Sequence, residues 1–429
     1  MNNKIDFGKI KEFDGKLKLT GDKSISHRAV FFASMAEGES IIENISLSAD
    51  VESTMNCFKA LGVDILKKDD KVFIKGAGFD GFKEPNKPLD AGNSGTTSRL
   101  LIGLLAARNI KAEIIGDESL SKRPMNRIIS PLNNLGASIT SNNGYLPVKI
   151  NGNGVVKKFN YELPVASAQL KTSLILYGLH SDEESTIIEK IPSRNHTEIM
   201  LNLHTIKEGN LTKINFSKKN YPIAQKYFVP GDISSAAFFI IMTILNKNSS
   251  LLIENVSLNP TRTGFLNVLK KMGADIEIVE QKSAASEIYG NLLVKSSKLT
   301  NIEIPIEIIP NIIDEIPILA IAGLFGEGKM IVKGAEELRI KECDRIKAIV
   351  ENIKKLNVEI DEMQDGFVLL GKPEGNFAKV LYESYDDHRI AMAFAVLSMV
   401  NENGGSVSNF DCVRISNPIF LKQVQEIIS

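Results

Sequence analysis

The sequence predicts an α/β (α+β) chain of two pseudo-threefold domains, each made of three βαβαββ-like units. Three observations support this: six apolar helices at near-regular intervals, a β-like run after each of them, and a last copy that is incomplete. A period of about 70 residues is too long for a solenoid repeat and suits one supersecondary unit. At 429 residues, two domains is also the division that size alone favours.

Each copy begins with a short polar cluster that opens into an apolar run of helical length. The six runs are residues 23–36, 93–107, 167–179, 232–245, 314–325 and 386–399. The marker residues at their starts lie 70, 73, 67, 80 and 73 residues apart, and they are Ser24, Ser94, Ser167, Ser234, Asp314 and Asp387. A helix that is apolar on all sides must be buried. Its first turn still presents free N–H donors and a partial positive charge, which suit an anion. We therefore expect several anion-binding helix ends in one protein.

A β-like run follows each apolar helix, then a polar loop, an amphipathic helix and usually a hairpin. The runs begin at Ile41, Ile114, Ile187, Leu252, Ile331 and Val407. Several of the amphipathic helices stop at a Leu-Gly pair, or at Asn357 in the fifth copy, as expected for a left-handed helix cap.

The sixth copy lacks a hairpin after its last helix, residues 419–428. The segment KLKLT (16–20) precedes the first apolar helix, so we expect the two termini to meet and residues 1–20 to complete this copy. Three units then fall on each side of a two-strand connection. The predicted domains are residues 21–230, and residues 231–429 together with 1–20.

The composition argues against several classes of protein. Lysine and arginine number 51 and aspartate and glutamate 52, so bulk attraction to nucleic acid is not expected. No apolar run is long enough to span a membrane, and the start MNNKIDFGKIKEF lacks the apolar core of a signal peptide. The three cysteines have no metal-ligand spacing, and no nucleotide-binding glycine motif is present. We expect a soluble, cytoplasmic, monomeric enzyme that acts on small molecules without a cofactor or a metal.

The polar clusters of the first half carry hydroxyl, amide and cationic donors. They are Lys23-Ser24 with Arg28, the glycine-rich stretch 90–99 around Gly95, Arg123 before Pro124, Ser167 with Gln169, and Ser193-Arg194. We expect Pro124 in the first turn of a helix and Arg123 just before it, where its guanidinium could clamp a carboxylate or phosphate. Taken singly, each cluster could also be a capped, solvated helix start.

The clusters of the second half add carboxylates. Asp314 opens an apolar helix, and Arg389 lies at the start of the sixth one. Lys341, Glu342 and Arg345 lie in the run KECDR, which we expect at a helix start with Lys341 and Arg345 on one face. Asp314 could instead be only a helix cap, and KECDR could be a solvated helix face. Because these clusters recur at the same end of the same repeat, we favour a functional site.

Eight segments in order resemble the signature segments of the EPSP synthase (3-phosphoshikimate 1-carboxyvinyltransferase) family. They are GDKSISHRA, LDAGNSGTTSRLL, KRPM, ASAQLK, SRNHTE, DEIPILA, RIKECDRI and DDHRIAMA, from Gly21 towards Pro418. The resemblance implies two domains that are joined by two strands. Each domain would be an inside-out α/β barrel of three units. It also implies transfer of the enolpyruvyl group of phosphoenolpyruvate to the 5-hydroxyl of shikimate 3-phosphate, a step of aromatic amino-acid biosynthesis.

The resemblance also implies roles for single residues. For shikimate 3-phosphate it implies Lys23, Ser24, Arg28, Gln169, Asp314 and Lys341, with the phosphate at Ser167 and Ser193. For phosphoenolpyruvate it implies Lys23, Gly95, Arg123, Gln169, Arg345 and Arg389. Asp314 would be the base on the hydroxyl, Glu342 the acid and base at the methylene carbon, and Lys23 would share in proton transfer. Glyphosate would compete with phosphoenolpyruvate.

Three positions depart from the better-known family pattern. Ala168 stands where many members have a second serine, and Lys171 or Arg194 could compensate. Ile415 replaces a substrate-binding lysine of some members, with Arg414 as an uncertain substitute. Glu337 replaces an asparagine found in part of the family.

Two other functions stay open. One is the sister enolpyruvyl transferase that acts on UDP-N-acetylglucosamine, although the loop 116–121 lacks that family's cysteine. The other is a non-catalytic module that binds anions or RNA ends, in which Asp314 and Glu342 would be idle.

Overall fold

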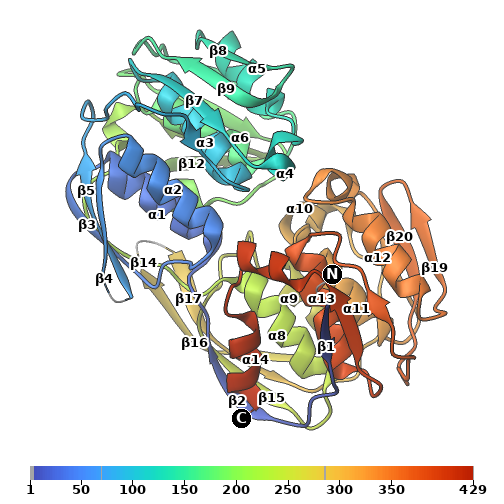
Figure 1. Cartoon of the computed structure of the whole chain (residues 1–429). Helices are drawn as coiled ribbons and strands as arrows, with labels where there is room; N and C mark the ends of the chain where they lie inside the picture. Colours follow the sequence, from blue (N-terminus) through green and yellow to red (C-terminus); the bar gives the residue numbers. More distant parts are fainter. Residues whose placement is uncertain (1–3, 69, 285–286, 429) are drawn as a thin grey trace. The chain divides into compact units, whose positions relative to one another are not determined.

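The computed structural model describes residues 4–68, 70–284 and 287–428 (Figure 1). The chain divides into two compact units. The N-terminal unit contains Gly21–Val229 and Ser283–Glu287, and the C-terminal unit contains Met1–Thr20, Pro230–Lys282 and Ile288–Ser429. These bounds differ from the expected division at Pro230 and at residues 283–287.

In the N-terminal unit, three apolar helices are each followed by a strand, one or two further helices and a hairpin. The first copy contains α1 (Lys23–Met35), β3 (Glu37–Glu43), α2 (Ala49–Ala60), β4 (Asp64–Lys68) and β5 (Lys71–Ala77). The second contains β6 (Leu89–Asp90), α3 (Gly95–Ala106), β7 (Lys111–Ile115), α4 (Glu118–Ser121), α5 (Asn126–Asn134), β8 (Ile139–Asn142) and β9 (Tyr145–Asn151). The third contains β10 (Asn160–Glu162), α6 (Ala168–Gly178), β11 (Ser185–Glu189), α7 (His196–Met200), β12 (His204–Glu208), β13 (Leu211–Phe216), η1 (Lys218–Asn220) and β14 (Lys226–Phe228).

The C-terminal unit repeats this order. The fourth copy contains α8 (Ile233–Leu245), β15 (Ser250–Ser257), α9 (Gly264–Lys271), β16 (Asp275–Ala284) and β17 (Glu287–Lys295), followed by η2 (Ile306–Ile308) and α10 (Ile309–Ile312). The fifth contains α11 (Ile316–Leu324), β18 (Lys329–Val332), η3 (Glu336–Ile340), α12 (Arg345–Lys354), β19 (Ile360–Met363) and β20 (Gly366–Leu370). The sixth contains β21 (Leu381–Tyr382), α13 (His388–Val400), β22 (Gly405–Ser408), η4 (Phe410–Ile415) and α14 (Phe420–Ile428), and β1 (Lys4–Phe7) and β2 (Asp14–Lys18) also lie in this unit.

All six predicted apolar helices are present and buried. In α8 and α11 nearly every side chain is inaccessible to solvent, as expected for helices that carry no charge. Helices α8, α11 and α13 contact one another in the C-terminal unit, and α3 contacts both α1 and α6 in the N-terminal unit. Each unit therefore has its own apolar core, with the repeated helices at its centre. Within the described ranges, no helix is long and apolar enough to cross a membrane.

The predicted helix stops are also present. Gly62, Gly136 and Gly273 follow amphipathic helices and have positive φ angles of 89°, 99° and 100°. Asn357 takes the equivalent place after α12, with φ 54°. These residues turn the chain from each helix into the following hairpin.

Each sheet holds one copy, but two strands are exchanged between distant copies. In the second, third and sixth copies the strand before the apolar helix pairs in parallel with the strand after it (β6 with β7, β10 with β11, β21 with β22). In contrast, β14 pairs in parallel with β3 of the first copy, and β2 with β15 of the fourth. Strand β2 ends shortly before the unit boundary after Thr20, and β14 ends shortly before the boundary after Val229. Each of these two strands completes a sheet of a copy that is distant in sequence.

This exchange corrects the prediction for the N-terminal residues. The segment 16–20 does not complete the sixth copy, because β2 pairs with β15. The strand that does so is β1, which pairs antiparallel with β22. Strand β22 thus has β1 on one side and β21 on the other, whereas β2 lies at the edge of the sheet of the fourth copy.

The contact between α3 and α6 depends on Gly103. A methyl group at this position would lie 2.2 Å from the backbone oxygen of Ser173 and 2.4 Å from its Oγ. We predict that Gly103→Ala destabilises the N-terminal unit by ~1–3 kcal/mol, because overpacking outweighs the better helix propensity of alanine. Urea unfolding followed by circular dichroism measures the change. Gly8→Ala, where a methyl group meets nothing within 4 Å, is the control, and equal stability of the two variants would contradict the prediction.

Candidate active site

The predicted site residues fall into two groups, one in each unit. The N-terminal group contains Lys23, Ser24, Arg28, Gly95, Arg123, Ser167, Gln169 and Ser193. The C-terminal group contains Asp314, Lys341, Glu342, Arg345 and Arg389. Most of these residues lie at or next to the N-terminal end of a helix, where free backbone N–H groups favour negative charge.

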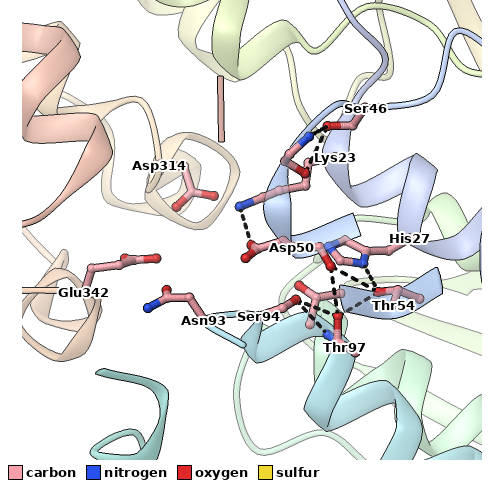
Figure 2. Close-up of polar contacts among 12 residues, drawn as sticks. Lys23, His27, Ser46, Asp50, Thr54, Asn93, Ser94, Thr97, Asp314 and Glu342 are labelled. Carbon is pink, nitrogen blue, oxygen red and sulfur yellow. Dashed lines mark hydrogen bonds and ion pairs between the residues drawn. The ribbon is translucent and has the colours of Figure 1, made fainter. Parts of the chain in front are cut away.

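Lys23 is the first residue of α1 and forms an ion pair with Asp50 in the first turn of α2. The two groups are 3.0 Å apart, and the lysine side chain remains partly accessible to solvent (Figure 2). Ser24 follows in the same helical turn, and its carbonyl oxygen accepts a hydrogen bond from Arg28 Nη1 at 2.9 Å. The start of α1 therefore places an ammonium group and a hydroxyl group side by side.

Buried hydroxyl groups connect the starts of α1, α2 and α3 below this lysine (Figure 2). His27 Nδ1 lies 2.7 Å from Thr54 Oγ1, which lies 2.7 Å from Thr97 Oγ1. Thr97 in turn donates to Ser94, the N-cap of α3, at 2.7 Å. Burial, reinforced by the charges of Lys23 and Arg28, holds the pKa of His27 well below its usual value. His27 is therefore neutral near pH 7, and this hydroxyl chain orders the start of α3.

Arg28 is a buried cation that donates its hydrogen bonds to neutral groups. Its guanidinium donates to Thr197 Oγ1 at 2.7 Å and to Thr172 Oγ1 at 2.8 Å, besides the carbonyl of Ser24. Among the described residues, no carboxylate oxygen lies within 4.0 Å of it. Burial lowers the pKa of Arg28 to about 10, although the more distant carboxylate of Glu198 opposes this shift. A buried charge without a counterion is costly, and a bound anion would provide one.

Gly95, Arg123 and Gln169 surround the loop before α3. Arg123 Nη2 donates to Asn93 Oδ1 at 2.8 Å. Gln169, in the first turn of α6, donates to Thr96 at 3.1 Å. Gly95 is the first helical residue of α3 and is buried. The structure thus brings three of the predicted phosphoenolpyruvate ligands to one loop.

The two predicted phosphate-binding serines have different local roles. Ser167 is the N-cap of α6, and its hydroxyl accepts from the backbone N–H of Leu170 at 3.3 Å. Ser193 lies in the loop between β11 and α7, where both its hydroxyl and its backbone N–H donate to Glu189.

In the C-terminal group, one buried guanidinium contacts three carboxylates. Arg345 Nε donates to Asp387 at 2.7 Å, Nη2 to Glu342 at 2.6 Å and Nη1 to Asp314 at 3.4 Å. Burial opposes the charged form, but the three carboxylates outweigh burial and raise the pKa of Arg345. Arg389 approaches Asp314 from the start of α13 and donates to its carbonyl oxygen at 2.9 Å. Asp314 therefore lies between two guanidinium groups.

Comparison with known proteins identifies the family. The family model described as EPSP synthase (3-phosphoshikimate 1-carboxyvinyltransferase) matches residues 8–424. A protein of Petrotoga mobilis named 3-phosphoshikimate 1-carboxyvinyltransferase is 45% identical over 99% of this chain and 100% of its own length. The chain belongs to the EPSP synthase family.

Solved structures agree with this assignment. EPSP synthase from Acinetobacter baumannii is 36% identical, with a TM-score of 0.88 over 100% of this chain and 98% of that one. The enolpyruvyl transferase NikO from Streptomyces tendae is only 14% identical, with a TM-score of 0.75 over 99% of this chain and 96% of that one, and shares the fold. The expected enolpyruvyl transferase fold is therefore confirmed.

Two local predictions for this EPSP synthase family member were wrong. Lys341 does not share a helical face with Arg345, because α12 begins only at Arg345, after its N-cap Asp344. Lys341 instead follows η3, and its Nζ lies 3.4 Å from Glu337 Oε1. Glu337 is one of the residues that depart from the family pattern. Pro124 is not in the first turn of α5, since Met125 is the N-cap.

Sequence reasoning also missed residues that hold the predicted ones in place. Asp50 contacts Lys23, and Arg99 contacts Gln169 at 2.8 Å. Asp387 accepts from the backbone N–H groups of Arg389 and Ile390 as the N-cap of α13, and it also binds Arg345. Their positions at helix starts were visible in the sequence, but their partners lie tens of residues away along the chain.

One of the three cysteines lies beside the C-terminal group, because Cys343 Sγ contacts Asp387 at 3.8 Å. Cys57, Cys343 and Cys412 are free thiols. Burial raises the pKa of Cys57 and of Cys412 to about 12, and it also raises the pKa of Cys343. Thiols with raised pKa values are poor nucleophiles at neutral pH.

The buried histidines predict a pH-dependent stability. Burial keeps the pKa of His27 well below 6.5 and lowers that of His180 to about 3. Below pH 6.5 the unfolded chain binds protons at both residues that the folded protein does not bind, so stability falls as the pH falls. Each histidine contributes a slope of up to ~1.4 kcal/mol per pH unit.

We therefore expect His27→Asn to reduce the slope of unfolding free energy against pH, between pH 6.5 and 5.5, by about one proton. Urea unfolding at several pH values measures the slope. His204→Asn, at an exposed histidine, is the matched substitution. Equal slopes in these two variants would contradict a neutral, buried His27.

Proposed function

We propose that this chain transfers the enolpyruvyl group of phosphoenolpyruvate to the 5-hydroxyl of shikimate 3-phosphate through the two groups of residues described above. The family match over residues 8–424 and the names of relatives at 44–45% identity support the reaction. Arg28 is the observation that best supports the residue assignment. Its buried guanidinium has neutral partners and needs an anion.

Shikimate 3-phosphate would bind at the starts of α1 and α6. Lys23, Ser24 and Arg28 would contact the shikimate part, and the carboxylate of this ligand is a suitable counterion for Arg28. Ser167 and Ser193 would contact the phosphate, with Gln169 beside them. Asp314 and Lys341 would reach the ring hydroxyls.

Phosphoenolpyruvate would bind to the loop before α3 and to the arginines of the C-terminal group. Lys23, the backbone of Gly95, Arg123 and Gln169 would contact it from the N-terminal unit. Arg345 and Arg389 would complete its site and stabilise the charge of the departing phosphate.

The reaction is an addition followed by an elimination through a tetrahedral intermediate. Asp314 would remove the proton of the 5-hydroxyl, and its contacts with Arg345 and Arg389 favour the ionised form that can accept a proton. Glu342 would protonate the methylene carbon and later remove a proton from the new methyl group. Lys23 would share in proton transfer.

Glu342 must be protonated before it can act as an acid. Its contact with Arg345 at 2.6 Å favours the opposite, ionised form. We infer that the phosphate of phosphoenolpyruvate competes for Arg345 and weakens this contact, which favours protonation of Glu342. Substrate binding would then prepare the acid.

We further propose that the protein works in the cytoplasm as a monomer. The free thiols suit a reducing compartment. Sedimentation of the purified protein across a range of concentrations tests the oligomeric state, and a concentration-dependent mass would contradict a monomer.

Phosphate release tests the function directly. We expect release to require both shikimate 3-phosphate and phosphoenolpyruvate, and to be unchanged by EDTA. Release with UDP-N-acetylglucosamine in place of shikimate 3-phosphate would support the sister enolpyruvyl transferase instead. No release with any acceptor would support a binding module.

Replacing the two carboxylates should slow the reaction more than it weakens binding. We predict that Asp314→Asn and Glu342→Gln each lower kcat by ~10²–10⁴-fold, the usual contribution of general acid–base catalysis. Calorimetric Kd values for shikimate 3-phosphate separate chemistry from binding. Glu336→Gln, at an exposed neighbouring glutamate, is the control. Equal losses in kcat and affinity would make these carboxylates positioning residues.

Gly95→Ala should affect glyphosate more than phosphoenolpyruvate. The added methyl group would lie 2.7 Å from Arg99 Nη1, the end of a flexible side chain, so the fold should tolerate it. Narrowing the site by one carbon costs ~1–3 kcal/mol of binding free energy. Glyphosate is longer than phosphoenolpyruvate and should therefore lose more affinity. We expect the unmutated enzyme to be sensitive to glyphosate. A ratio of glyphosate Ki to phosphoenolpyruvate KM that is the same in Gly95→Ala and the unmutated enzyme would contradict a role of this loop in the site.

A further inference from the structure

A buried group of charges lies beneath the loop that carries Ser193. Lys171, in α6, is fully buried, and its Nζ contacts Glu189 Oε2 at 2.9 Å and Glu198 Oε1 at 2.6 Å. Glu189 ends β11 and Glu198 lies in α7, so the lysine joins both ends of this loop. We call these three residues the Lys171 cluster.

The partners of Lys171 exclude the role expected from the sequence. Lys171 was a candidate to replace the hydroxyl missing at Ala168, but two carboxylates already neutralise its charge and no part of its side chain is exposed. Arg28 is also a buried cation, yet its hydrogen bonds go to neutral groups. Arg28 therefore suits an anionic ligand, whereas Lys171 has a structural partner set.

Glu189 connects the cluster to the predicted phosphate site. Its Oε1 accepts from Ser193 Oγ at 2.5 Å and from the backbone N–H of the same residue at 3.2 Å. Its other oxygen is held by Lys171. Both oxygens of this carboxylate are therefore engaged, and Glu189 is only 3% exposed to solvent. Glu189 thus fixes the position of Ser193.

Glu198 contacts the same lysine but a different part of the site. It lies next to Thr197, whose hydroxyl accepts from Arg28 Nε at 2.7 Å. The hydrogen bonds of the described residues do not link Glu198 to Ser193. The two carboxylates of the cluster thus differ in which predicted ligand contact they support.

We propose that Glu189 is a positioning residue for the 3-phosphate of shikimate 3-phosphate, acting through Ser193 and held in place by Lys171. This inference rests on the function proposed above. Glu189 itself would not contact the substrate. The bond from the backbone N–H of Ser193 to Glu189 holds the loop in place, and the Ser193 hydroxyl would turn from Glu189 to donate its one proton to the phosphate. Because the loop is already ordered, binding would cost less conformational freedom.

The substitution Glu189→Gln tests this role with little change in shape. A glutamine has one acceptor oxygen in place of two, so it cannot accept from both Lys171 and Ser193 as the carboxylate does, and its hold on the loop weakens. Lys171 keeps Glu198 as its counterion, so no buried charge is left unpaired. Glu198→Gln is the matched control, because it removes one carboxylate from the same lysine but leaves Glu189 and Ser193 paired.

The measurement is the ratio of the Kd of shikimate to the Kd of shikimate 3-phosphate, which isolates the contribution of the phosphate. We expect Glu189→Gln to lower this ratio about ten-fold, equivalent to ~1.4 kcal/mol, and to leave the KM of phosphoenolpyruvate unchanged. Glu198→Gln should leave the ratio unchanged, since both ligands carry the carboxylate assigned to Arg28. In a Ser193→Ala background, Glu189→Gln should have little further effect on the ratio.

Other outcomes would overturn the proposal. Equal weakening of both ligands by Glu189→Gln, or the same ratio in Glu189→Gln and Glu198→Gln, would mean that Glu189 only stabilises the fold. Circular dichroism of each variant shows whether it is folded. A failure of the proposed function would look different. In that case the unmutated protein would neither release phosphate nor prefer shikimate 3-phosphate to shikimate.

Discussion

The burial of six apolar helices is the constraint on which the rest of the structure depends. A helix such as α8 or α11 has no polar face, so protein must cover it on every side. The sheets and amphipathic helices of each unit provide that cover. The apolar middles of these helices leave few places for charge, and most of the predicted site residues lie at or next to helix starts.

Buried cations in this protein differ in what neutralises them. Arg345 contacts three carboxylates and Lys171 contacts two, whereas Arg28 contacts two threonine hydroxyls and a carbonyl. A buried cation paired with carboxylates stabilises its surroundings only when the geometry of the pair is good. A cation with neutral partners keeps its attraction for an anion. This difference favours a structural role for Lys171 and supports the binding role proposed for Arg28.

Arg345 combines pairing with carboxylates and a proposed role in ligand binding. Its three carboxylates include the two residues proposed for catalysis, so the same guanidinium contacts both Asp314 and Glu342. In the proposed function it also binds phosphoenolpyruvate, which would couple the acid–base groups and the ligand through one side chain. Asp387 anchors this arrangement, because it caps α13 with one oxygen and holds Arg345 with the other.

The fold tolerates wide divergence in sequence. NikO from Streptomyces tendae shares it at 14% identity, with a TM-score of 0.75. Apolar helices, left-handed stops such as Gly62 and Asn357, and hairpins can be formed by many sequences.

The sequence by itself determined the repeat, the six helices, their stops and the family. These features depend on local patterns, because hydrophobicity, helix caps and short motifs act over a few residues. The eight signature segments also named the candidate residues, including Asp314, Glu342 and Arg345.

Only the tertiary structure decided how distant segments pair. It placed β1 rather than β2 beside β22, brought Asp50 to Lys23, and enclosed Lys171 between Glu189 and Glu198. It also began α12 at Arg345, which separates Lys341 from the helix. A strand edge is completed by whichever strand reaches it, and a buried charge by whichever counterion packs against it. Both depend on long-range packing, which a local pattern does not contain.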